Sequence, residues 1–521
     1  MPLYFCRLLF ILSTFFVRTQ SQQHPPPPKL PGLLLDCGTS APLVDERGLQ
    51  WFPDGAYIGA GAPRNLSLSG LFPTLSTLRS FPFSAGSPSR KYCYVLPAVR
   101  RSRYLVRTTY FYGGVNGAGV PPPVFDQIVD GTFWTAVNTT QEYAAGMASY
   151  YEGVFLARGK TISVCVAGNA AYTLSDPFIS ALEFIRLPDS VYNATDFNES
   201  AMGLIARTRF GSTGLPERYP DDRFDRYWHP LTGSMHAVGR THNITVSEFW
   251  NIPPADVFDT AIVADQDRSL VLQWPSVSLP NSSYYIALYF ADTAPNSSRT
   301  FNVFINDYSF YSGLTVTSSG LSVFSTKWIL SGLTTITLTP GSTLPPLINA
   351  GELFGLFSLG KLTYTRDVIN LENIKRSIKN PPEDWNGDPC MPRGYSWTGV
   401  TCFEGSRIRV VALNLSSMGL SGFLSPSIGN LTALTNISFA DNNFSGPIPE
   451  LSQLKMLKKL HLQDNQLTGK IPHTLGNLKK LHELFLQNNN LTGEVPANLL
   501  QKPALNLKLL PGNNFSPSTP T

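Results

Sequence analysis

Four aspartates near the middle of the chain are the residues best suited to acid–base chemistry. Asp221, Asp222 and Asp225 lie close together, and Asp189 lies upstream of them. Two carboxylates on either side of a glycosidic bond form the machinery of most glycoside hydrolases. Aspartates are equally common in turns, where the side chain accepts backbone hydrogen bonds. We favour the turn, and a jelly-roll glycosidase remains the less favoured alternative.

Other catalytic and cofactor motifs are missing from the sequence. His229, His236 and His242 are too widely spaced to share one helix face, so nothing marks them as metal ligands. The chain has no Gly-x-Ser-x-Gly elbow, phosphate-binding loop or kinase signature. We therefore predict a protein that is not an enzyme, with no catalytic residue, no cofactor and no metal.

Aromatic residues in loops of the first half are the candidate ligand contacts. Aromatic faces stack on sugar rings, and tyrosine hydroxyls add hydrogen bonds. The candidates are Trp51, Tyr57, Tyr110, Tyr112, Trp134, Tyr150 and Tyr151. In a β-sandwich most aromatics are core residues, so this alternative stays open for each of them. A basic run, Arg100 to Arg107, could contact acidic polysaccharide, but local pairing along a strand fits the small net charge better.

The segments that carry these residues have the signals of β-structure. Stretches such as 103–111 are rich in β-branched and aromatic residues and are separated by glycine and proline clusters. Landmarks recur in the same order, because 104–111 resembles 284–290 and 177–183 resembles 346–352. We predict a mostly β protein with two tandem β-sandwich (jelly-roll) domains, at 32–190 and 198–365.

A repeat with steps of 23 or 24 residues fills 410–521. Its clearest copy is Leu481, Leu484, Leu486, Asn489, Leu491, Gly493, Val495 and Pro496. This pattern predicts a short leucine-rich-repeat solenoid, in which stacked copies bury their leucines together and each Asn satisfies backbone groups between copies. Residues between the buried leucines must point outward, and four of them form the candidate partner face: His461, Gln463, Phe485 and Gln487.

Two elements join the sandwiches to the repeats. Val368, Leu371, Ile374 and Ile378 have helical spacing behind Asp367, which predicts a linker helix at 366–382 with Asp367 as its N-cap. Cys390 and Cys402 flank a tryptophan-containing segment, which predicts a disulfide-stapled cap at 383–409. A zinc site would need further Cys or His ligands, and none lie nearby.

The N-terminus and the sequons predict an extracellular chain. Residues 1–21 have the pattern of a signal peptide, and 22–31 form a proline-rich linker. No later stretch reaches the roughly 18 apolar residues of a membrane helix. Charged residues are 15% of 521, and the net charge is +4, so no nucleic-acid partner is expected. The candidate glycosylation sites are Asn65, Asn138, Asn193, Asn198, Asn243, Asn281, Asn296, Asn414, Asn430, Asn436, Asn443, Asn490 and Asn514.

Several motifs together resemble a plant family. They are Asp-Cys-Gly at 36–38, Tyr-Phe-Tyr-Gly-Gly at 110–114, Ile-Ser-Ala-Leu-Glu at 179–183, YPDDRFDRYW at 219–228 and NIPPADVFDTA at 251–261. Jointly they resemble plant malectin-like domains, and the cap and repeats resemble plant extracellular leucine-rich repeats. The chain is thus similar to the ectodomain of malectin-like leucine-rich-repeat receptor proteins, without a kinase.

The resemblance implies binding of a cell-wall carbohydrate or a secreted peptide, with a receptor kinase or other membrane protein as co-receptor. It implies a location in the cell wall or at the outer face of the plasma membrane. A non-catalytic cell-wall lectin is the alternative. Where relatives often have a cysteine, this chain has Ser80; we pair Cys93 with Cys165 and leave Cys37 free. Because the sequence stops inside a degraded repeat, a shortened form or a decoy is expected.

Overall fold

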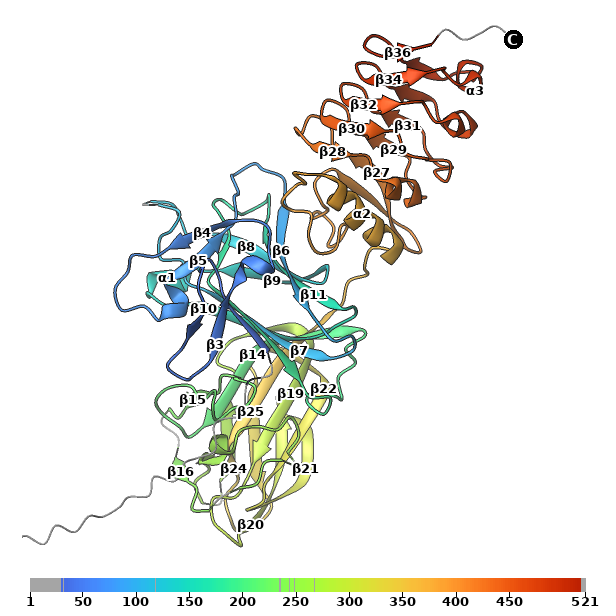
Figure 1. The fold of residues 1–521 in the computed structure, drawn as a ribbon. Helices are drawn as coiled ribbons and strands as arrows, with labels where there is room; N and C mark the ends of the chain where they lie inside the picture. The colour runs from blue at the N-terminus through green and yellow to red at the C-terminus, as the bar shows by residue number, and fades with distance from the viewer. Residues whose placement is uncertain are drawn as a thin grey trace, which may run out of the picture.

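The computed structural model describes residues 30, 32–117, 119–233, 236–242, 244–247, 249–266 and 268–516. The predicted signal peptide, residues 22–29 and 31 of the proline-rich linker, and the sequon residue Asn243 lie outside the described residues. The chain is mostly β, as predicted. It has two β-sandwich lobes, lobe 1 (β1 to β13) and lobe 2 (β14 to β25), and Figure 1 shows lobe 1 between lobe 2 and the repeats. No helix in the described part is both long and apolar enough to cross a membrane.

Lobe 1 is a β-sandwich built from β1 to β13. Its core of Leu35, Tyr94, Val106, Phe125, Phe178 and their neighbours lies between β1, β13, β7 and β10 on one side and β6, β11, β8 and β9 on the other. Its elements are β1 (Gly32–Asp36), β2 (Leu43–Val44), β3 (Gln50–Pro53), η1 (Asp54–Ala56), β4 (Ala62–Asn65), η2 (Pro73–Leu75), β5 (Thr77–Ser80), β6 (Arg90–Pro97), β7 (Arg103–Tyr110), β8 (Val124–Val129), β9 (Thr132–Asn138), α1 (Thr140–Ala144), β10 (Ser149–Leu156), β11 (Thr161–Gly168), β12 (Phe178–Ile179) and β13 (Ala181–Leu187).

Lobe 2 is a second sandwich with the same plan. The matched landmarks take matching places, because β13 pairs with β7 in lobe 1 and β25 pairs with β19 in lobe 2. Its elements are β14 (Ser200–Phe210), β15 (His229–Leu231), β16 (Ala237–Gly239), η3 (Ala255–Phe258), β17 (Thr260–Val263), β18 (Leu270–Gln273), β19 (Leu279–Phe290), β20 (Ser298–Ile305), β21 (Tyr308–Thr317), β22 (Leu321–Gly332), β23 (Thr335–Pro340), β24 (Leu347–Ile348) and β25 (Ala350–Ser358).

The two lobes share one continuous sheet, which runs through β13, β7, β10, β14, β25 and β19 (Figure 1). A separate core covers this junction and contains buried side chains of both lobes, among them Leu105, Tyr192, Trp228 and Tyr285. The 219–228 and 251–261 motifs serve this core. Asn251 donates to the hydroxyls of Tyr285 and Tyr289, and Arg226 donates to the carbonyl oxygen of Asn251. The lobes are therefore fused through backbone pairing and packing.

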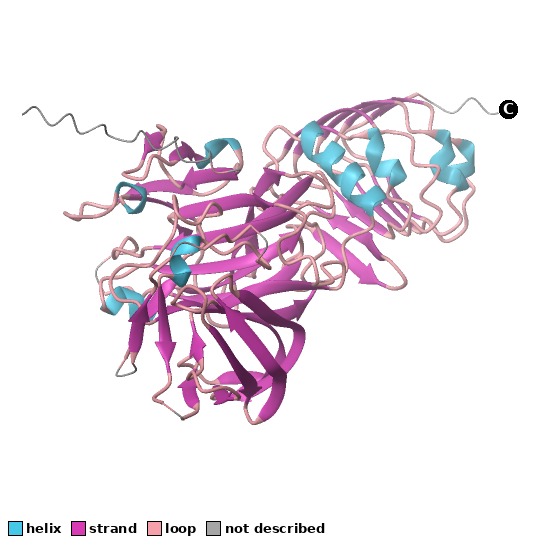
Figure 2. Ribbon diagram, turned by 90° about the horizontal axis from the view of Figure 1, so that it is seen from below, coloured by secondary structure: helices cyan, strands magenta, loops and turns pink. Residues whose placement is uncertain are grey.

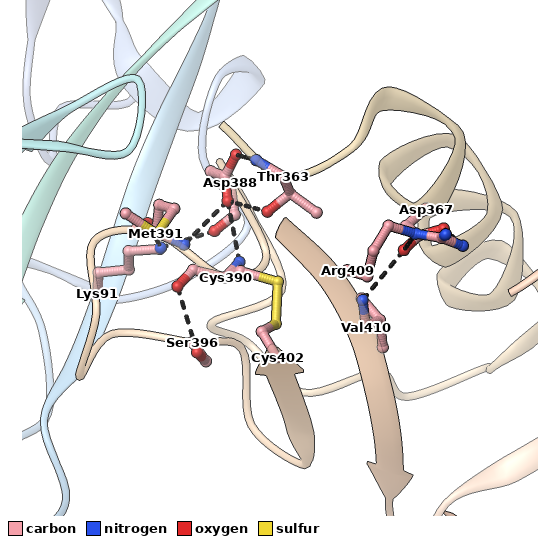
Figure 3. The surroundings of a disulfide bond; sticks show 10 residues. All are labelled: Lys91, Thr363, Asp367, Asp388, Cys390, Met391, Ser396, Cys402, Arg409 and Val410. Carbon is pink, nitrogen blue, oxygen red and sulfur yellow. Dashed lines mark hydrogen bonds and ion pairs between the residues drawn. A yellow bond between two sulfur atoms is a disulfide. The ribbon is translucent and has the colours of Figure 1, made fainter. Parts of the chain in front are cut away.

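A helix and a cap seal the first repeat. In α2 (Thr365–Ser377), Leu371 and Ile374 join Trp385 and Trp397 of the cap in the core of the solenoid. The prediction that Asp367 caps α2 was wrong. The N-cap residue is Tyr364, and Asp367 lies buried in the first turn, where it accepts bonds from the Arg409 side chain and the Val410 backbone (Figure 3).

The repeats form a narrow solenoid with two sheets, and short helical turns gather on another side (Figure 2). The strands pair in parallel from repeat to repeat, and the cap strand β26 pairs antiparallel with β27. The predicted asparagine ladder is confirmed: Asn465 donates to backbone oxygens of its own and the preceding repeat and accepts from Phe444. The elements are β26 (Val400–Glu404), β27 (Ile408–Asn414), β28 (Ser421–Phe423), η4 (Pro426–Asn430), β29 (Asn436–Ser438), β30 (Asn443–Pro447), β31 (Lys459–His461), β32 (Gln466–Gly469), η5 (His473–Asn477), β33 (Glu483–Phe485), β34 (Asn490–Gly493), α3 (Ala497–Leu500), β35 (Asn506–Lys508) and β36 (Asn514–Phe515).

Candidate ligand-binding site

A groove opens where the shared sheet passes from lobe 1 to lobe 2. Strands β10 and β14 pair at two positions, Gly153 with Gly203 and Val154 with Met202. Past this point both strands continue and a groove of about 620 Å³ lies between them. The glycines permit the crossing, because a Cβ at Gly153 would lie 2.9 Å from the Trp134 ring and one at Gly203 3.1 Å from its Nε1. We call this space the inter-lobe groove.

Aromatic rings from both lobes line the inter-lobe groove. Trp134 comes from β9, Tyr150 and Tyr151 from β10, and Phe357 from β25, and all four side chains are partly exposed. The Tyr150 hydroxyl lies 2.6 Å from Nε2 of His229, which β15 brings to one end of the groove. Burial and the nearby Arg207 lower the pKa of His229, so its ring is neutral at pH 7. The rings offer flat apolar faces beside hydrogen-bonding groups, the combination that binds sugars and peptide side chains.

A row of buried charges crosses the sheet beneath the groove. Arg107 donates to Glu183 over 2.5 Å and to Glu152 over 2.8 Å. Arg207 lies 2.8 Å from Glu152 and donates to Glu352 over 2.7 Å. Burial alone would raise the pKa of Glu152, but Arg207 and Arg107 outweigh it and hold that pKa below its usual value. Glu152, at the middle of the row, therefore keeps its charge at neutral pH. One arginine nitrogen, Nη1 of Arg207, is buried without a hydrogen-bond partner among the described residues.

The structure gathers three of the seven aromatic candidates in the groove, namely Trp134, Tyr150 and Tyr151. Tyr57 is half-buried against the core of lobe 1. Tyr110 and Tyr112 are corrections, because their side chains are 1% and 2% exposed and pack inside lobe 1. Trp51 is also buried, with its Nε1 donating to Asp45, and it presents little surface to a ligand.

The acidic cluster serves the fold. Asp222 accepts bonds from Arg226 and from Nε1 of Trp228, and Asp225 pairs with Arg218 and Arg107. Both carboxylates are fully buried, whereas Asp189 and Asp221 are exposed. The two buried carboxylates are thus occupied by arginine and tryptophan donors of the fold, as the turn interpretation expects.

The predicted partner face is an array of stacked side chains on neighbouring repeats. The rings of His461 and Phe485 lie 4.4 Å apart and nearly parallel, and Nζ of Lys508 lies 4.5 Å from the centre of the Phe485 ring. Glu483 accepts a bond from Lys459 and lies 3.0 Å from Nε2 of His461. Gln463 and Gln487 stand beside this array, and their Oε1 atoms lack a hydrogen-bond partner among the described residues. We call His461, Phe485 and Lys508 the stacked face.

Two disulfides fix the framework around these surfaces, and they join the cysteines paired from the sequence. Cys93–Cys165 crosses β6 and β11 of lobe 1, and Cys390–Cys402 closes the cap. Figure 3 shows the second bond beside Asp388, whose carboxylate accepts from Thr363 and from the backbone of Cys390. Nζ of Lys91 reaches from β6 to the carbonyl oxygens of Asp388 and Met391 and ties the cap to lobe 1. Cys37 is free and buried, and all twelve described sequon asparagines are exposed.

Sequence reasoning missed the residues that build the groove floor. Arg207 and Glu352 were not identified, because they meet Glu152 across strands that are distant in the chain. One signal was available: Glu183 and Glu352 end the two matched landmarks, and both carboxylates lie in this buried row.

The fold defines a modular, mostly β class of protein. Two β-sandwich lobes share one sheet with a groove across it, and a disulfide cap and a short solenoid follow them. The malectin-like domain profile matches residues 35–356, the leucine rich repeat N-terminal domain matches 366–403, and leucine rich repeats match 455–498. The chain belongs to the malectin-like domain family and also carries leucine-rich repeats.

Relatives and solved structures agree with this assignment. The chain is 32% identical over 474 residues to the "Probable LRR receptor-like serine/threonine-protein kinase At1g67720" of Arabidopsis thaliana, over 85% of this chain and 49% of that protein. It is 30% identical to the leucine-rich repeat receptor-like serine/threonine-protein kinase At2g14510 of the same plant, over 82% and 49%. The chain thus spans about half the length of these relatives.

Two solved structures share the fold of a large part of this chain. The ANX2 ectodomain of Arabidopsis thaliana matches with a TM-score of 0.52 at 16% identity, over 63% of this chain and 97% of that one. A structure of the plant peptide RALF23 in complex with FER and LLG2 matches with a TM-score of 0.51 at 16% identity, over 63% and 95%. The described fold is therefore that of receptor ectodomains and carries no kinase.

Proposed function

We propose that this chain is an extracellular binding protein that takes a secreted peptide into the inter-lobe groove and presents its stacked face to a membrane protein partner. The observation that carries the proposal is the groove itself, which opens at the seam of two fused lobes and offers aromatic faces over a charged floor. Sites between domains are common places for ligands, because both sides contribute contacts.

Further features support an extracellular peptide receptor. Two disulfides and twelve exposed sequon asparagines suit an oxidising, glycosylating compartment. A protein of the same fold occurs in a complex with the plant peptide RALF23 and a further protein, LLG2, which supports a peptide ligand together with a co-receptor. The cap bonds to lobe 1 through Lys91, so a partner held by the repeats would stand in a fixed position relative to the lobes.

A cell-wall carbohydrate is the second candidate ligand, and the exposed ring faces favour it. Trp134, Tyr150 and Tyr151 line one groove, and stacking on such faces is how proteins commonly hold sugar rings. A carbohydrate would also use the neutral His229 and the Tyr150 hydroxyl as hydrogen-bonding groups. The two ligand classes therefore compete for the same surface.

The experiment is a parallel screen of the purified secreted chain on a peptide array and a glycan array. We expect peptide binding that Trp134→Ala weakens by about 30-fold, the loss of a hot-spot side chain. Trp328→Ala is the matched control, because Trp328 is a half-buried tryptophan of lobe 2 outside the groove lining. Glycan binding with the same dependence on Trp134, and no peptide binding, would favour the carbohydrate instead.

A second comparison tests the division between lobes and repeats. Phe485→Ala removes the centre of the stacked face and should weaken capture of a co-receptor ectodomain while leaving ligand binding unchanged. The opposite result would show that the repeats hold the ligand.

A further inference from the structure

A second, smaller cavity lies on the lobe 1 side of the charge row, and we call it the Glu183 cavity. Its volume is about 210 Å³, enough for one side chain or one sugar ring. Its lining includes Trp51, the exposed Phe72 and Tyr227. Thr109 and Glu183 form part of its inner lining, and Glu46 is exposed at its edge. The rings of Tyr227 and Tyr150 lie 5.2 Å apart, so this cavity and the inter-lobe groove are neighbours.

The carboxylate of Glu183 has unused hydrogen-bonding capacity, although its residue is 1% exposed. Its Oε2 accepts a 2.5 Å bond from Arg107, but its Oε1 has a bond of 3.4 Å from the Tyr227 hydroxyl. The matching glutamate of lobe 2, Glu352, has strong hydrogen bonds to both carboxylate oxygens. Glu352 accepts from Tyr192, Arg207 and Tyr289 over 2.6 to 2.7 Å. The difference leaves Oε1 of Glu183 as a strong acceptor without a strong donor.

The buried network that contains Glu183 lacks one positive charge. Its ion pairs connect three arginines with four carboxylates: Arg107, Arg207 and Arg218 with Glu152, Glu183, Asp225 and Glu352. Arg226 adjoins the network but pairs with Asp222, so it adds no net charge. Burial raises the pKa of Glu183 despite the opposing effect of Arg107, and the charge of Asp225 adds to the rise. A buried carboxylate in this position is stabilised by a cation brought to its free oxygen.

The remaining charges around the cavity do not supply that cation. Arg47 lies 3.2 Å from Asp45, and Arg218 is held by Asp225. The ring of Tyr227 is in contact with cations already, since the Arg107 guanidinium lies 3.7 Å from its centre. The exposed ring of Phe72 adds further surface for a cation.

We propose that the Glu183 cavity receives one lysine or arginine side chain of the peptide ligand, which supplies the missing charge to Oε1 of Glu183. The inference rests on the proposed peptide ligand. It adds that the peptide carries a basic residue at the position that lies beside Tyr227, between the inter-lobe groove and the Glu183 cavity. The cationic group would bond to Glu183 and lie against the ring of Phe72. Glu46 at the edge would attract it.

The experiment uses small probes on the full secreted chain. Saturation-transfer NMR titrations would measure the binding of four probes. They are N-acetyl-arginine amide, N-acetyl-lysine amide, the neutral isostere N-acetyl-citrulline amide, and methyl β-glucoside. We expect one or both cations to bind at least tenfold more tightly than citrulline amide, and Glu183→Gln to abolish that preference. Equal binding of arginine and citrulline, or binding of the glucoside alone, would overturn the proposal.

Two exposed positions keep the test valid if Glu183→Gln fails to fold. Phe72→Ala and Glu46→Gln should each weaken the cation probes several-fold, and Tyr308→Ala, an equally exposed aromatic on lobe 2, should not. Probe binding unaffected by both edge variants would contradict the proposal. If array peptides bind equally well after their Lys and Arg residues are replaced by Gln, the basic-residue inference fails and the peptide ligand stands. If the cation probes bind but no peptide does, the peptide ligand fails and the cation site stands.

Discussion

Replacing Arg207 with methionine tests whether the buried charge row holds the lobes together. The side chain is 1% exposed and serves two carboxylates at once, Glu152 and Glu352. Removing one partner of a buried ion pair costs about 3–5 kcal/mol, because the remaining charge stays buried without compensation. Glu152 keeps Arg107 and Glu352 keeps two tyrosine hydroxyls, so we expect the lower part of that range, about 3 kcal/mol.

The assay is urea unfolding of the full chain followed by tryptophan fluorescence, with Arg47→Met as the matched control. Arg47 forms an ion pair with Asp45, but its side chain is 38% exposed, so that variant should lose less than about 1 kcal/mol. A loss below about 1 kcal/mol for Arg207→Met would refute the claim that the row is a stabilising element.

The pH dependence of the same variant gives an independent check. In the native chain the pKa values of Glu152 and Glu352 are held below their usual value, so their contribution is present above the unfolded-state pKa and falls in acid. Without Arg207, burial dominates and raises both pKa values, and protonation then relieves the unpaired charge. The stability deficit of Arg207→Met should therefore shrink as the pH falls from 7 to 5, and a constant deficit would contradict this explanation.

Three further predictions follow from other parts of the chain. Asn465→Ala should destabilise the repeats by about 1–3 kcal/mol in urea unfolding, because it leaves backbone groups of two repeats unbonded, whereas exposed Gln466→Ala should change stability by less than about 0.5 kcal/mol. Burial raises the pKa of Asp130 to about 6, although bonds from Ser163 and the charge of Arg158 oppose the rise. The stability that protonated Asp130 contributes is therefore present in acid and is lost as the pH rises through 6. Between pH 5 and 7.5, the unfolding free energy of Asp130→Asn should rise by about 1–3 kcal/mol relative to that of the native chain, and no such gain would contradict the assignment. Burial also raises the pKa of the Cys37 thiol well above its usual value, so iodoacetamide should label it in urea but not in the folded chain, as mass spectrometry would show.

The repeats could be predicted almost completely, whereas the groove could not. Each leucine position of the solenoid recurs with one period, and each ladder asparagine bonds to near neighbours in the stack, so the pattern is visible along the chain. The aromatic residues of the sandwiches carry no such signal. Tyr110 and Tyr150 have similar surroundings in sequence, yet Tyr110 is buried and Tyr150 lines the groove.

Competition between partners explains the other differences. Asp367 has the sequence context of an N-cap, but Arg409 and the Val410 backbone, distant in sequence, bind its carboxylate instead. The shared sheet likewise depends on the pairing of Gly153 with Gly203, which no local pattern encodes. Residues matched between the two lobes were the one sequence signal that pointed toward the charge row, through Glu183 and Glu352.

Hydrogen–deuterium exchange of the full chain, with and without the tightest-binding peptide from the array, tests the central claim most directly. We predict that the peptide slows amide exchange around Tyr150–Glu152, Gly203–Arg207 and Gly355–Phe357, the backbone that borders the inter-lobe groove. Slower exchange confined to the repeats, with these three segments unchanged, would contradict the assignment of the groove as the ligand site.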